Sequence, residues 1–360
     1  MKKRYASLDL VKFLGVLCIS CLYHYRRIGG KEGFSFLFEG TPIVDALSRH
    51  GALLVELLFM ISGLLAFQSY FGRISRGEQP FSKFLSARVS RLFPVMIVST
   101  LVMAAGQWIF FSKTGAFFYN MPNNDLPHLL FNLFGVQTWI SPQFTVNQPT
   151  WYISVLLACY LIFFGISSLC KKRDCRPLFI APILLGLVIL STGLNFAGLN
   201  SYMARGLISF FLGVTLAMLL QKAWKSRTFL LAALGILAFC CLFYLVLPFE
   251  LIGDLQLFLP FFIYPALITL CMKSELLNKV CDCGLVRYLG AISFDFYLWD
   301  IPIYMGLSLV SRAFHWTLQY DSPFFFLFVL AIHFVVAIAS HHLIEKPMVR
   351  ILEKKREEKA

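Results

Sequence analysis

Stretches of about twenty apolar residues recur along almost the whole chain, and they constrain its fold more than any other feature. A helix needs roughly 20 such residues to cross the hydrocarbon core of a bilayer. The chain of 360 residues is 58% hydrophobic and only 14% charged, whereas an average soluble domain is roughly a quarter charged. These proportions exclude an ordinary soluble protein and predict a chain that is solvated by lipid.

Ten stretches are candidate spans, and no polar segment of domain size separates them. Helices satisfy their own backbone hydrogen bonds in lipid, and the alternating pattern of barrel strands is absent. We therefore predict an all-α polytopic bundle of about ten transmembrane helices, with one membrane domain over residues 1–350 and a charged cytoplasmic tail over residues 351–360. The candidate spans are 8–25, 51–71, 92–111, 150–169, 177–193, 203–220, 228–247, 255–272, 290–310 and 324–344.

The distribution of Lys and Arg predicts the orientation of these spans. Cytoplasmic loops of membrane proteins carry an excess of both residues. If the N-terminus is cytoplasmic, the cytoplasmic segments contain about 24 of the 32 Lys and Arg, and the outer segments contain about seven. We therefore expect both termini in the cytoplasm and a multi-pass protein of the plasma membrane. The net charge of +13 lies in short loops, so it does not favour nucleic-acid binding.

The ten cysteines all fall in candidate spans or cytoplasmic segments, where an oxidising compartment would not pair them. Cys18 and Cys21 have a C-x-x-C spacing, but no histidine or second pair flanks them. The chain has no zinc-binding spacing, no P-loop and no dinucleotide fingerprint. We therefore expect no metal and no nucleotide cofactor of those classes.

The first span contains three ionisable residues, which are costly in lipid and therefore point to function. Asp9 and Lys12 lie near its cytoplasmic end, where they could also pair with each other and reach toward water. His24 lies about 22 Å further along the helix axis, near the outer edge of the bilayer. It could belong to an aromatic belt at the interface, or it could act as a general base in an outward-facing pocket.

The second span carries a single acid, Glu56, about one and a half turns below its outer end. This depth is close to that of His24 on an adjacent antiparallel helix. A carboxylate that accepts from one imidazole nitrogen fixes the tautomer and leaves the other nitrogen as a base. Glu56 is therefore a candidate catalytic partner of His24; alternatively, it is protonated or bonded to a different helix.

Other polar and aromatic residues suggest binding sites at the two ends of the bundle. Arg88 and Arg91 share one helical face and could clamp phosphate, although any cytoplasmic flank is basic. Arg205 interrupts the apolar run at the outer end of the sixth span. It could bind an oxyanion or an acceptor, or its side chain could extend to the lipid headgroups. Trp151 and Tyr152 could form an aromatic rim for a sugar, or anchor a helix at the interface.

Further ionisable residues lie in the last two spans, without an assigned role. Asp295 and Asp300 are five residues apart in the ninth span and so point to different faces. Asp300 would lie near the middle of the bilayer, where it needs a partner if it is charged. The tenth span carries several more such residues, which we expect mostly to form hydrogen bonds between helices: His333, His341, His342 and Glu345.

Taken together and in order, these motifs resemble the acyltransferase-3 family of multi-spanning membrane O-acyltransferases. Each motif is weak alone, but their order and depth are specific. The Trp-Tyr pair is a variant that occurs in the family, and we expect no fused outer domain. The matching segments are Leu8-Asp9 with His24 at the other end of the helix, Val55-Glu56 through Ser62-Gly63, Arg88-x-x-Arg91 with Pro94, Pro149-Thr150-Trp151-Tyr152, Arg205 to Gly213, Leu289-Gly290 with Ser293 and Tyr297-Leu298-Trp299, and Ile344-Glu345-Lys346-Pro347.

The resemblance implies a cytoplasmic acyl-CoA donor, usually acetyl-CoA, and transfer to a hydroxyl of an envelope or exported carbohydrate. It also implies that His24 is catalytic and that Arg88 and Arg91 bind the donor. We count Lys12 as a third candidate for donor binding. The alternative is a transporter or flippase for a lipid-linked saccharide, which would also use buried charges and an aromatic rim. The acceptor, the acyl chain and the oligomeric state are not readable from the sequence.

The sequence departs from the family pattern at three positions. The family usually has an arginine eleven residues before its histidine, whereas Lys12 precedes His24 by twelve. Twelve α-helical steps place two residues about 120° apart. Either a one-residue π-bulge brings Lys12 and His24 back to the same helix face, or the two residues lie on different faces. In addition, Leu156 stands where many members carry a glutamate, and Asp300 stands where a histidine is common.

Overall fold

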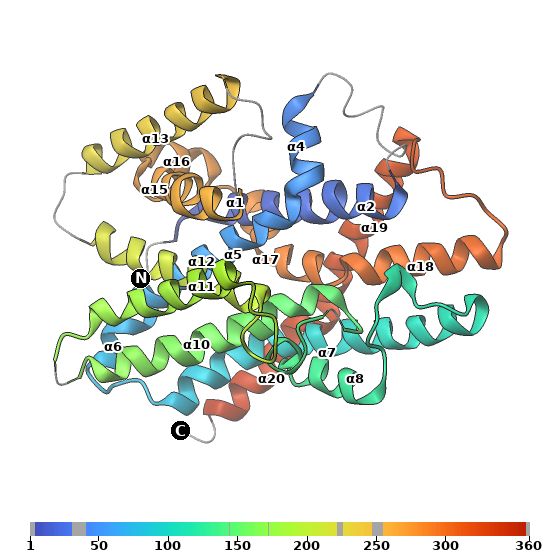
Figure 1. The fold of residues 1–360 in the computed structure, drawn as a ribbon, viewed down its shortest axis with the longest axis horizontal. Coiled ribbons are helices and arrows are strands. Elements are labelled where there is room, and N and C mark those ends of the chain that lie inside the picture. The colour runs from blue at the N-terminus through green and yellow to red at the C-terminus, as the bar shows by residue number, and fades with distance from the viewer. Residues whose placement is uncertain are drawn as a thin grey trace.

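The computed structural model describes residues 4–30, 41–143, 145–171, 173–221, 226–246 and 255–357, most of which lie in helices. Over these ranges, β-structure is limited to two isolated bridges, Asn123–Thr145 and Phe196–Leu199. The prediction of an all-α protein is therefore confirmed. Figure 1 shows the helices packed around a centre formed by α1, α5, α12 and α17.

The helices are numbered along the chain, with η for short 3-10 and π segments. In order they are α1 (Ala6–Cys18), η1 (Ile19–His24), α2 (Tyr25–Gly29), α4 (Pro42–His50), η3 (Gly51–Leu53), α5 (Leu54–Ala66), η4 (Phe67–Phe71), α6 (Gly72–Ser75), α7 (Phe81–Thr114), η5 (Phe118–Asn120), α8 (Leu126–Leu133), α9 (Gln137–Ile140), η6 (Gln148–Thr150), α10 (Trp151–Leu169), η7 (Arg176–Ile180), α11 (Ala181–Thr192), α12 (Ser201–Leu220), α13 (Ser226–Val246), α14 (Leu255–Phe258), η9 (Leu259–Ile263), α15 (Tyr264–Lys273), α16 (Glu275–Cys281), α17 (Gly284–Leu298), α18 (Asp300–Ala313), α19 (Pro323–Ser340), η10 (His341–Glu345) and α20 (Lys346–Glu357).

Six helical segments of the described chain are long and apolar enough to cross a membrane, and a bent pair raises the number to seven. The bent pair is α15 with α16, which meet at an angle of 78°. The predicted count of ten spans is therefore not confirmed. Shorter apolar helices cover Arg176–Thr192 and Arg227–Ala238, and the predicted span 290–310 is divided at Trp299 between α17 and α18. The six segments are Ala6–Gly29, Ile43–Ser75, Phe81–Thr114, Gln148–Leu169, Ser201–Leu220 and Pro323–Lys354.

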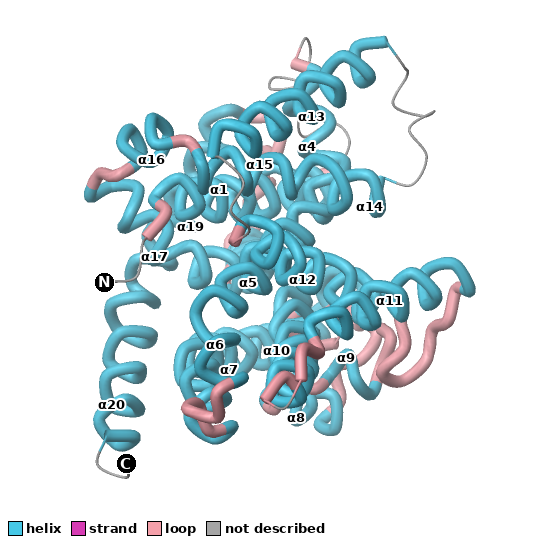
Figure 2. Tube along the Cα trace, turned by 90° about the vertical axis from the view of Figure 1, so that its left-hand side faces the viewer, coloured by secondary structure: helices cyan, strands magenta, loops and turns pink. Residues whose placement is uncertain are grey.

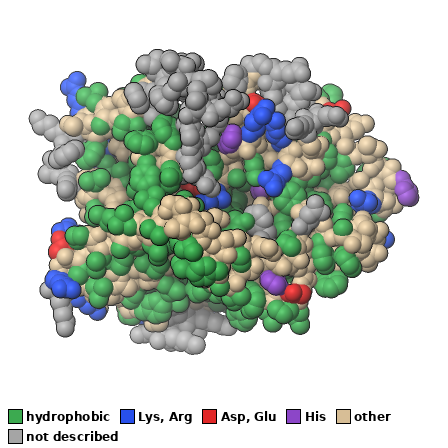
Figure 3. All heavy atoms as spheres, in the orientation of Figure 1, with side chains coloured by type: hydrophobic (Ala, Val, Ile, Leu, Met, Phe, Trp, Pro, Cys, Tyr) green, Lys and Arg blue, Asp and Glu red, His purple; other side chains and the backbone are tan. Residues whose placement is uncertain are grey.

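The surface of the molecule carries many large apolar side chains. Trp108, Leu184, Phe328 and Val335 each expose more than half of their area. In Figure 3, hydrophobic side chains cover much of the visible face, and charged side chains form small separate groups. Such a surface is unfavourable in water and suits contact with lipid. The charged helix α20 instead extends away from the main body (Figure 2), where it contacts α7.

Helices α5 and α12 pack so closely that their backbones touch through two glycines. A Cβ atom at Gly63 would lie 1.9 Å from the carbonyl oxygen of Phe210, and one at Gly213 would lie 2.0 Å from that of Met60. Small residues permit such contacts between membrane helices. This contact fixes α5 against α12 and therefore determines which residues of the two helices face each other.

The first helix widens into a π-helical segment, Ile19–His24, before it continues as α2. A π turn holds one extra residue and disturbs the regular hydrogen-bond ladder. The hydroxyl of Tyr304 on α18 donates to the carbonyl of Ser20 at 2.7 Å. Of the two arrangements that the sequence left open for Lys12 and His24, the structure therefore has the one with the π-bulge.

Candidate active site

A cavity of about 380 Å³ lies among α1, α5, α7, α10 and α17. We call it the arginine cavity, because Lys12, Arg88 and Arg91 all line it. Helix α7 presents the two arginines on one face, as their spacing predicts. Neither arginine takes part in an ion pair within the described part of the chain, so the cavity carries unneutralised positive charge.

Aromatic rings hold the guanidinium of Arg88 in place. Its central carbon lies 4.3 Å from the ring centroid of Tyr70 and 4.9 Å from that of Tyr160. These are distances at which a cation is attracted to an aromatic face. The Nε atom of Arg88 is buried and has no hydrogen-bond partner among the described residues. The side chain is thus fixed in direction and has a donor available for a ligand.

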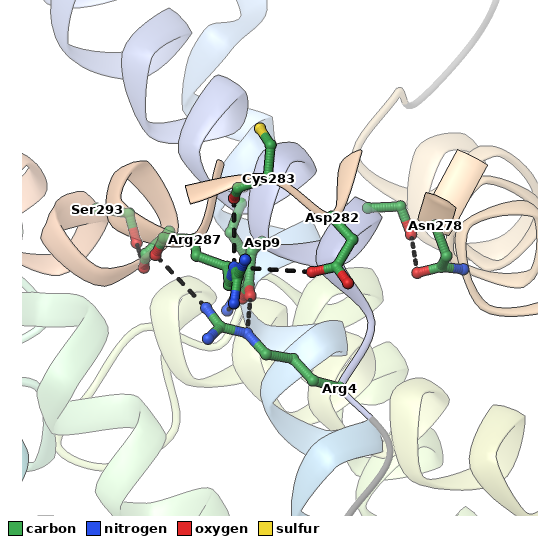
Figure 4. A network of polar contacts seen from close by, with 10 residues as sticks. Arg4, Asp9, Asn278, Asp282, Cys283, Arg287 and Ser293 are labelled. Atoms are coloured by element: carbon green, nitrogen blue, oxygen red, sulfur yellow. Dashed lines mark hydrogen bonds and ion pairs between the residues drawn. The ribbon is translucent and has the colours of Figure 1, made fainter. Parts of the chain in front are cut away.

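A second cavity of about 340 Å³ adjoins the first and shares Lys12, Arg91 and Gly290 with it. We call it the vestibule. Asp9 bridges two cations there: Arg4 Nε donates to its Oδ2 at 2.7 Å, and Lys12 Nζ lies 2.7 Å from its Oδ1. Figure 4 shows Arg4 between Asp9 and the backbone of Arg287, to whose carbonyl it also donates. Asp9 and Lys12 therefore do pair, and Lys12 also lines the arginine cavity.

A third cavity of about 220 Å³ contains the predicted base, His24. We call it the histidine cavity. Arg27, Trp151, Tyr202 and Arg205 also line it. Lys12 and Val16 face the arginine cavity, while Ile19 and His24 face the histidine cavity. Because of the π segment, one side of the first helix therefore serves both cavities.

The two cavities meet at one side chain. Tyr297, near the end of α17, lines both the arginine cavity and the histidine cavity. It is buried, and its ring packs edge-on against that of Tyr152 with centroids 5.8 Å apart. Tyr297 therefore separates the basic cavity from the cavity that holds His24.

The imidazole of His24 is oriented by a buried carboxylate. His24 Nδ1 lies 2.5 Å from Asp300 Oδ2, and both residues are buried. Asp300 is the first residue of α18, where the helix dipole favours a negative charge. A proton on Nδ1 that is donated to Asp300 leaves Nε2 of His24 as the acceptor, which is the arrangement of a general base.

A second histidine contacts the other oxygen of the same carboxylate. His333 Nε2 lies 3.4 Å from Asp300 Oδ1, and His333 Nδ1 lies 2.8 Å from the carbonyl oxygen of Val329. A carbonyl only accepts, so Nδ1 carries a proton. His333 can donate to Val329 and to Asp300 at the same time only if both ring nitrogens carry a proton. The positive charge of that form would balance the buried negative charge of Asp300.

A comparison with known families agrees with this arrangement. The family model described as an acyltransferase domain matches residues 5–342, nearly the whole chain. The chain belongs to the acyltransferase-3 family. It is therefore a membrane acyltransferase, and the matched range includes every residue that lines the three cavities except Arg4. No curated protein and no solved structure gives a significant match.

The prediction that Glu56 orients the histidine of this acyltransferase-3 protein is wrong. Glu56 instead pairs with Arg205, through Nε at 2.5 Å and Nη2 at 3.1 Å. Arg205 Nη2 also donates to the carbonyl of Ala52 at 2.8 Å. The reason is the close contact between α5 and α12, which turns Glu56 toward α12.

The predicted aromatic rim is divided between two cavities. Trp151 lines the histidine cavity, where the guanidinium of Arg205 lies 5.0 Å from its ring centroid. Tyr152 lines the arginine cavity, and its hydroxyl lies 3.1 Å from Ser62 Oγ. Adjacent residues of a helix point about 100° apart, and here this rotation places Trp151 and Tyr152 in different cavities.

Sequence reasoning missed the partner of the catalytic candidate. Asp300 was noted as an acid that needs a partner, and His333 as a residue that bonds between helices. One continuous span was expected over 290–310, so the start of a new helix at Asp300, next to His24, was not foreseen. Because Asp300 stands where a histidine is common in the acyltransferase-3 family, this position already suggested a residue close to the site.

Proposed function

We propose that the protein transfers an acyl group, usually acetyl, from cytoplasmic acyl-CoA to a hydroxyl of an envelope or exported carbohydrate. The observation that carries this proposal is the meeting of the arginine cavity and the histidine cavity at Tyr297. One cavity offers charges suited to phosphates, and the other offers a base suited to a hydroxyl. A single side chain separates them.

The arginine cavity and the vestibule suit the donor. Coenzyme A carries a diphosphate and a further phosphate, and arginine binds such groups with paired hydrogen bonds. Arg88 and Arg91 have no acidic partner in the described chain, whereas Arg4 and Lys12 share Asp9. The positive-inside distribution of Lys and Arg favours a cytoplasmic location for this end of the bundle. The pantetheine arm would then extend toward Tyr297.

The histidine cavity suits the acceptor. Trp151 offers an aromatic face, on which a sugar ring can stack, and Arg27 and Arg205 offer donors to its oxygens. Arg205 is held by Glu56, so its position is fixed before an acceptor binds. Such preorganisation reduces the entropy that binding would otherwise cost.

The chemistry follows from the orientation of His24. Its Nε2 accepts the proton of the acceptor hydroxyl while the oxygen attacks the thioester carbonyl. The tetrahedral intermediate then collapses, the carbon–sulfur bond breaks, and the new ester forms. The imidazolium returns its proton to the departing thiolate, which leaves as free coenzyme A thiol. Asp300 keeps the ring in one tautomer and stabilises the imidazolium during this cycle.

Labelled acetyl-CoA and membrane vesicles test the proposal. We expect label to reach carbohydrate with the native protein and not with a His24→Ala variant of equal abundance. A matched control is His128→Ala, because His128 pairs with Asp125 and lines none of the three cavities. Full transfer by the His24→Ala variant would exclude the base role.

The alternative of a transporter or flippase predicts a different result from the same vesicles. A transporter would move a lipid-linked saccharide across the membrane without incorporating label. The match to the acyltransferase family model supports the enzyme over the transporter. Comparing the envelope polysaccharide of a strain that lacks the protein, by mass, would identify the acceptor.

A further inference from the structure

Three ionisable residues converge at a place that the proposed reaction does not use. Asp295 lies on α17, and His341 and Glu345 lie one turn apart on η10, which joins α19 to α20. All three are buried, and none lines the arginine cavity, the vestibule or the histidine cavity. One candidate ligand atom from each lies within 4.8 Å of the others.

One oxygen of this cluster has no hydrogen-bond partner. Ser340 Oγ donates to Asp295 Oδ1 at 2.5 Å, but Asp295 Oδ2 is buried and receives no hydrogen bond within the described residues. It lies 3.5 Å from His341 Nδ1. Two ligands of a tetrahedral ion with bonds of about 2.1 Å are separated by about 3.4 Å. Oδ2 and Nδ1 are thus spaced as two ligands of one ion would be.

The charge of the cluster also calls for a cation. Two carboxylates face a single imidazole, and no Lys or Arg of the described chain forms an ion pair with either acid. Burying such charge without compensation is costly. His341 Nδ1 contacts the carboxylate of Glu345 as well, so a shared proton can supply part of the compensation. A divalent cation would supply all of it.

We propose that Asp295, His341 and Glu345 bind one divalent transition-metal cation, Zn²⁺ or Mn²⁺. One imidazole nitrogen and two carboxylate oxygens are ligands that both ions accept. Binding displaces the proton between His341 and Glu345, because a coordinated imidazole nitrogen has no proton. Mg²⁺ prefers oxygen ligands and retains several waters, so a buried site with an imidazole suits it poorly.

The ion would act as a structural link rather than as a catalyst. It would join α17 to the turn between α19 and α20. Helix α17 carries Tyr297 near its end, and Asp300 follows directly as the start of α18. The metal ion would therefore hold the end of α17, on which the positions of Tyr297 and Asp300 depend. The full set of ligands is not apparent in the sequence, because Asp295 lies 46 positions before His341.

Metal analysis of the purified full-length protein tests this proposal directly. The protein is prepared in detergent, loaded separately with Zn²⁺, Mn²⁺ or Mg²⁺, desalted, and analysed by mass spectrometry of the elements. We expect about one Zn²⁺ or Mn²⁺ per chain to be retained, and no Mg²⁺. A chelator should then lower the temperature of thermal unfolding.

Two variants and one control locate the ion. Asp295→Asn and Glu345→Gln should each lose the retained metal, whereas His342→Ala should keep it. His342 is the neighbour of His341 but bonds to the hydroxyl of Tyr288 at 3.1 Å instead. Wild-type protein that retains no metal after loading would overturn the proposal, as would an Asp295→Asn variant that retains as much as wild type. If both variants fail to fold, the metal content of the wild type and its response to the chelator decide.

Discussion

The carboxylate of Asp300 lies 2.5 Å from His24 Nδ1, although 276 residues separate the two in the sequence. Helix α17, which carries Tyr297, ends at Leu298, and α18 begins at Asp300. The break between α17 and α18 therefore places Asp300, the partner of the proposed base, one turn after Tyr297, which lines both cavities. The contact between Asp300 and His24 and the position of Tyr297 between the cavities thus both depend on the junction of α17 and α18.

Replacing Asp300 by Asn should lower kcat by about 10²- to 10⁴-fold, because the amide can stabilise the wrong tautomer of His24. The KM for acyl-CoA should change little, since Asp300 does not line the arginine cavity. Steady-state transfer in vesicles measures both constants. Asp321→Asn, at an exposed position outside the cavities, is the matched control and should behave as wild type. An unchanged kcat for Asp300→Asn would refute the orienting role.

Replacing Arg88 or Arg91 by Gln should raise the KM for acyl-CoA by about ten- to a hundredfold, the range expected for one lost hydrogen bond to a charged group. The effect on kcat should be smaller, because neither residue touches the histidine cavity. Donor titration at a saturating acceptor concentration separates the two constants. Arg76→Gln is the control, since Arg76 is exposed and pairs with Glu78. An equal rise in KM for all three variants would indicate a general charge effect.

Replacing Tyr297 by Ala should join the two cavities and let water reach the thioester. We expect acyl-CoA hydrolysis without acceptor to rise relative to transfer. Tyr297→Phe keeps the ring that fills the space and should keep hydrolysis at the wild-type level. Release of free thiol in the absence of carbohydrate is the measurement. If the Ala variant shows no more hydrolysis than the Phe variant, Tyr297 does not separate the two cavities.

Replacing Gly63 by Ala should destabilise the protein by about 1–3 kcal/mol, because the new methyl group would overlap the backbone of α12. Gly165→Ala is the matched control on α10, where nothing lies within 4 Å of the added Cβ. That change should be neutral or stabilise the helix by up to about 1 kcal/mol. Thermal unfolding in detergent compares the two. Equal stability of both variants would contradict the close contact between α5 and α12.

The sequence was most informative where a property depends on neighbouring residues. Apolar length predicted helices, and the i, i+3 spacing placed Arg88 and Arg91 on one face. Apolar length did not predict where a helix breaks, so the span expected at 290–310 is two helices that meet at Trp299. The predicted span 255–272, by contrast, ends just before the bend between α15 and α16.

Direction around a helix was not predictable from the local sequence. His24 and Glu56 were expected to face each other, but they bond to different partners. Which way Glu56 turns depends on the contact between Gly63 and Phe210, which involves helices far apart in the sequence. The same applies to Trp151 and Tyr152, whose cavities depend on the rotation of α10.

The wide turn at Ile19–His24 changes how chains of this family should be aligned. In a regular α-helix, a basic side chain eleven positions before the histidine lies within about 20° of its direction. One additional residue absorbed by a π turn restores nearly the same direction. Two chains whose first helices differ by one residue can therefore present the same pair of groups. A gap at this point of an alignment is consistent with an unchanged catalytic geometry.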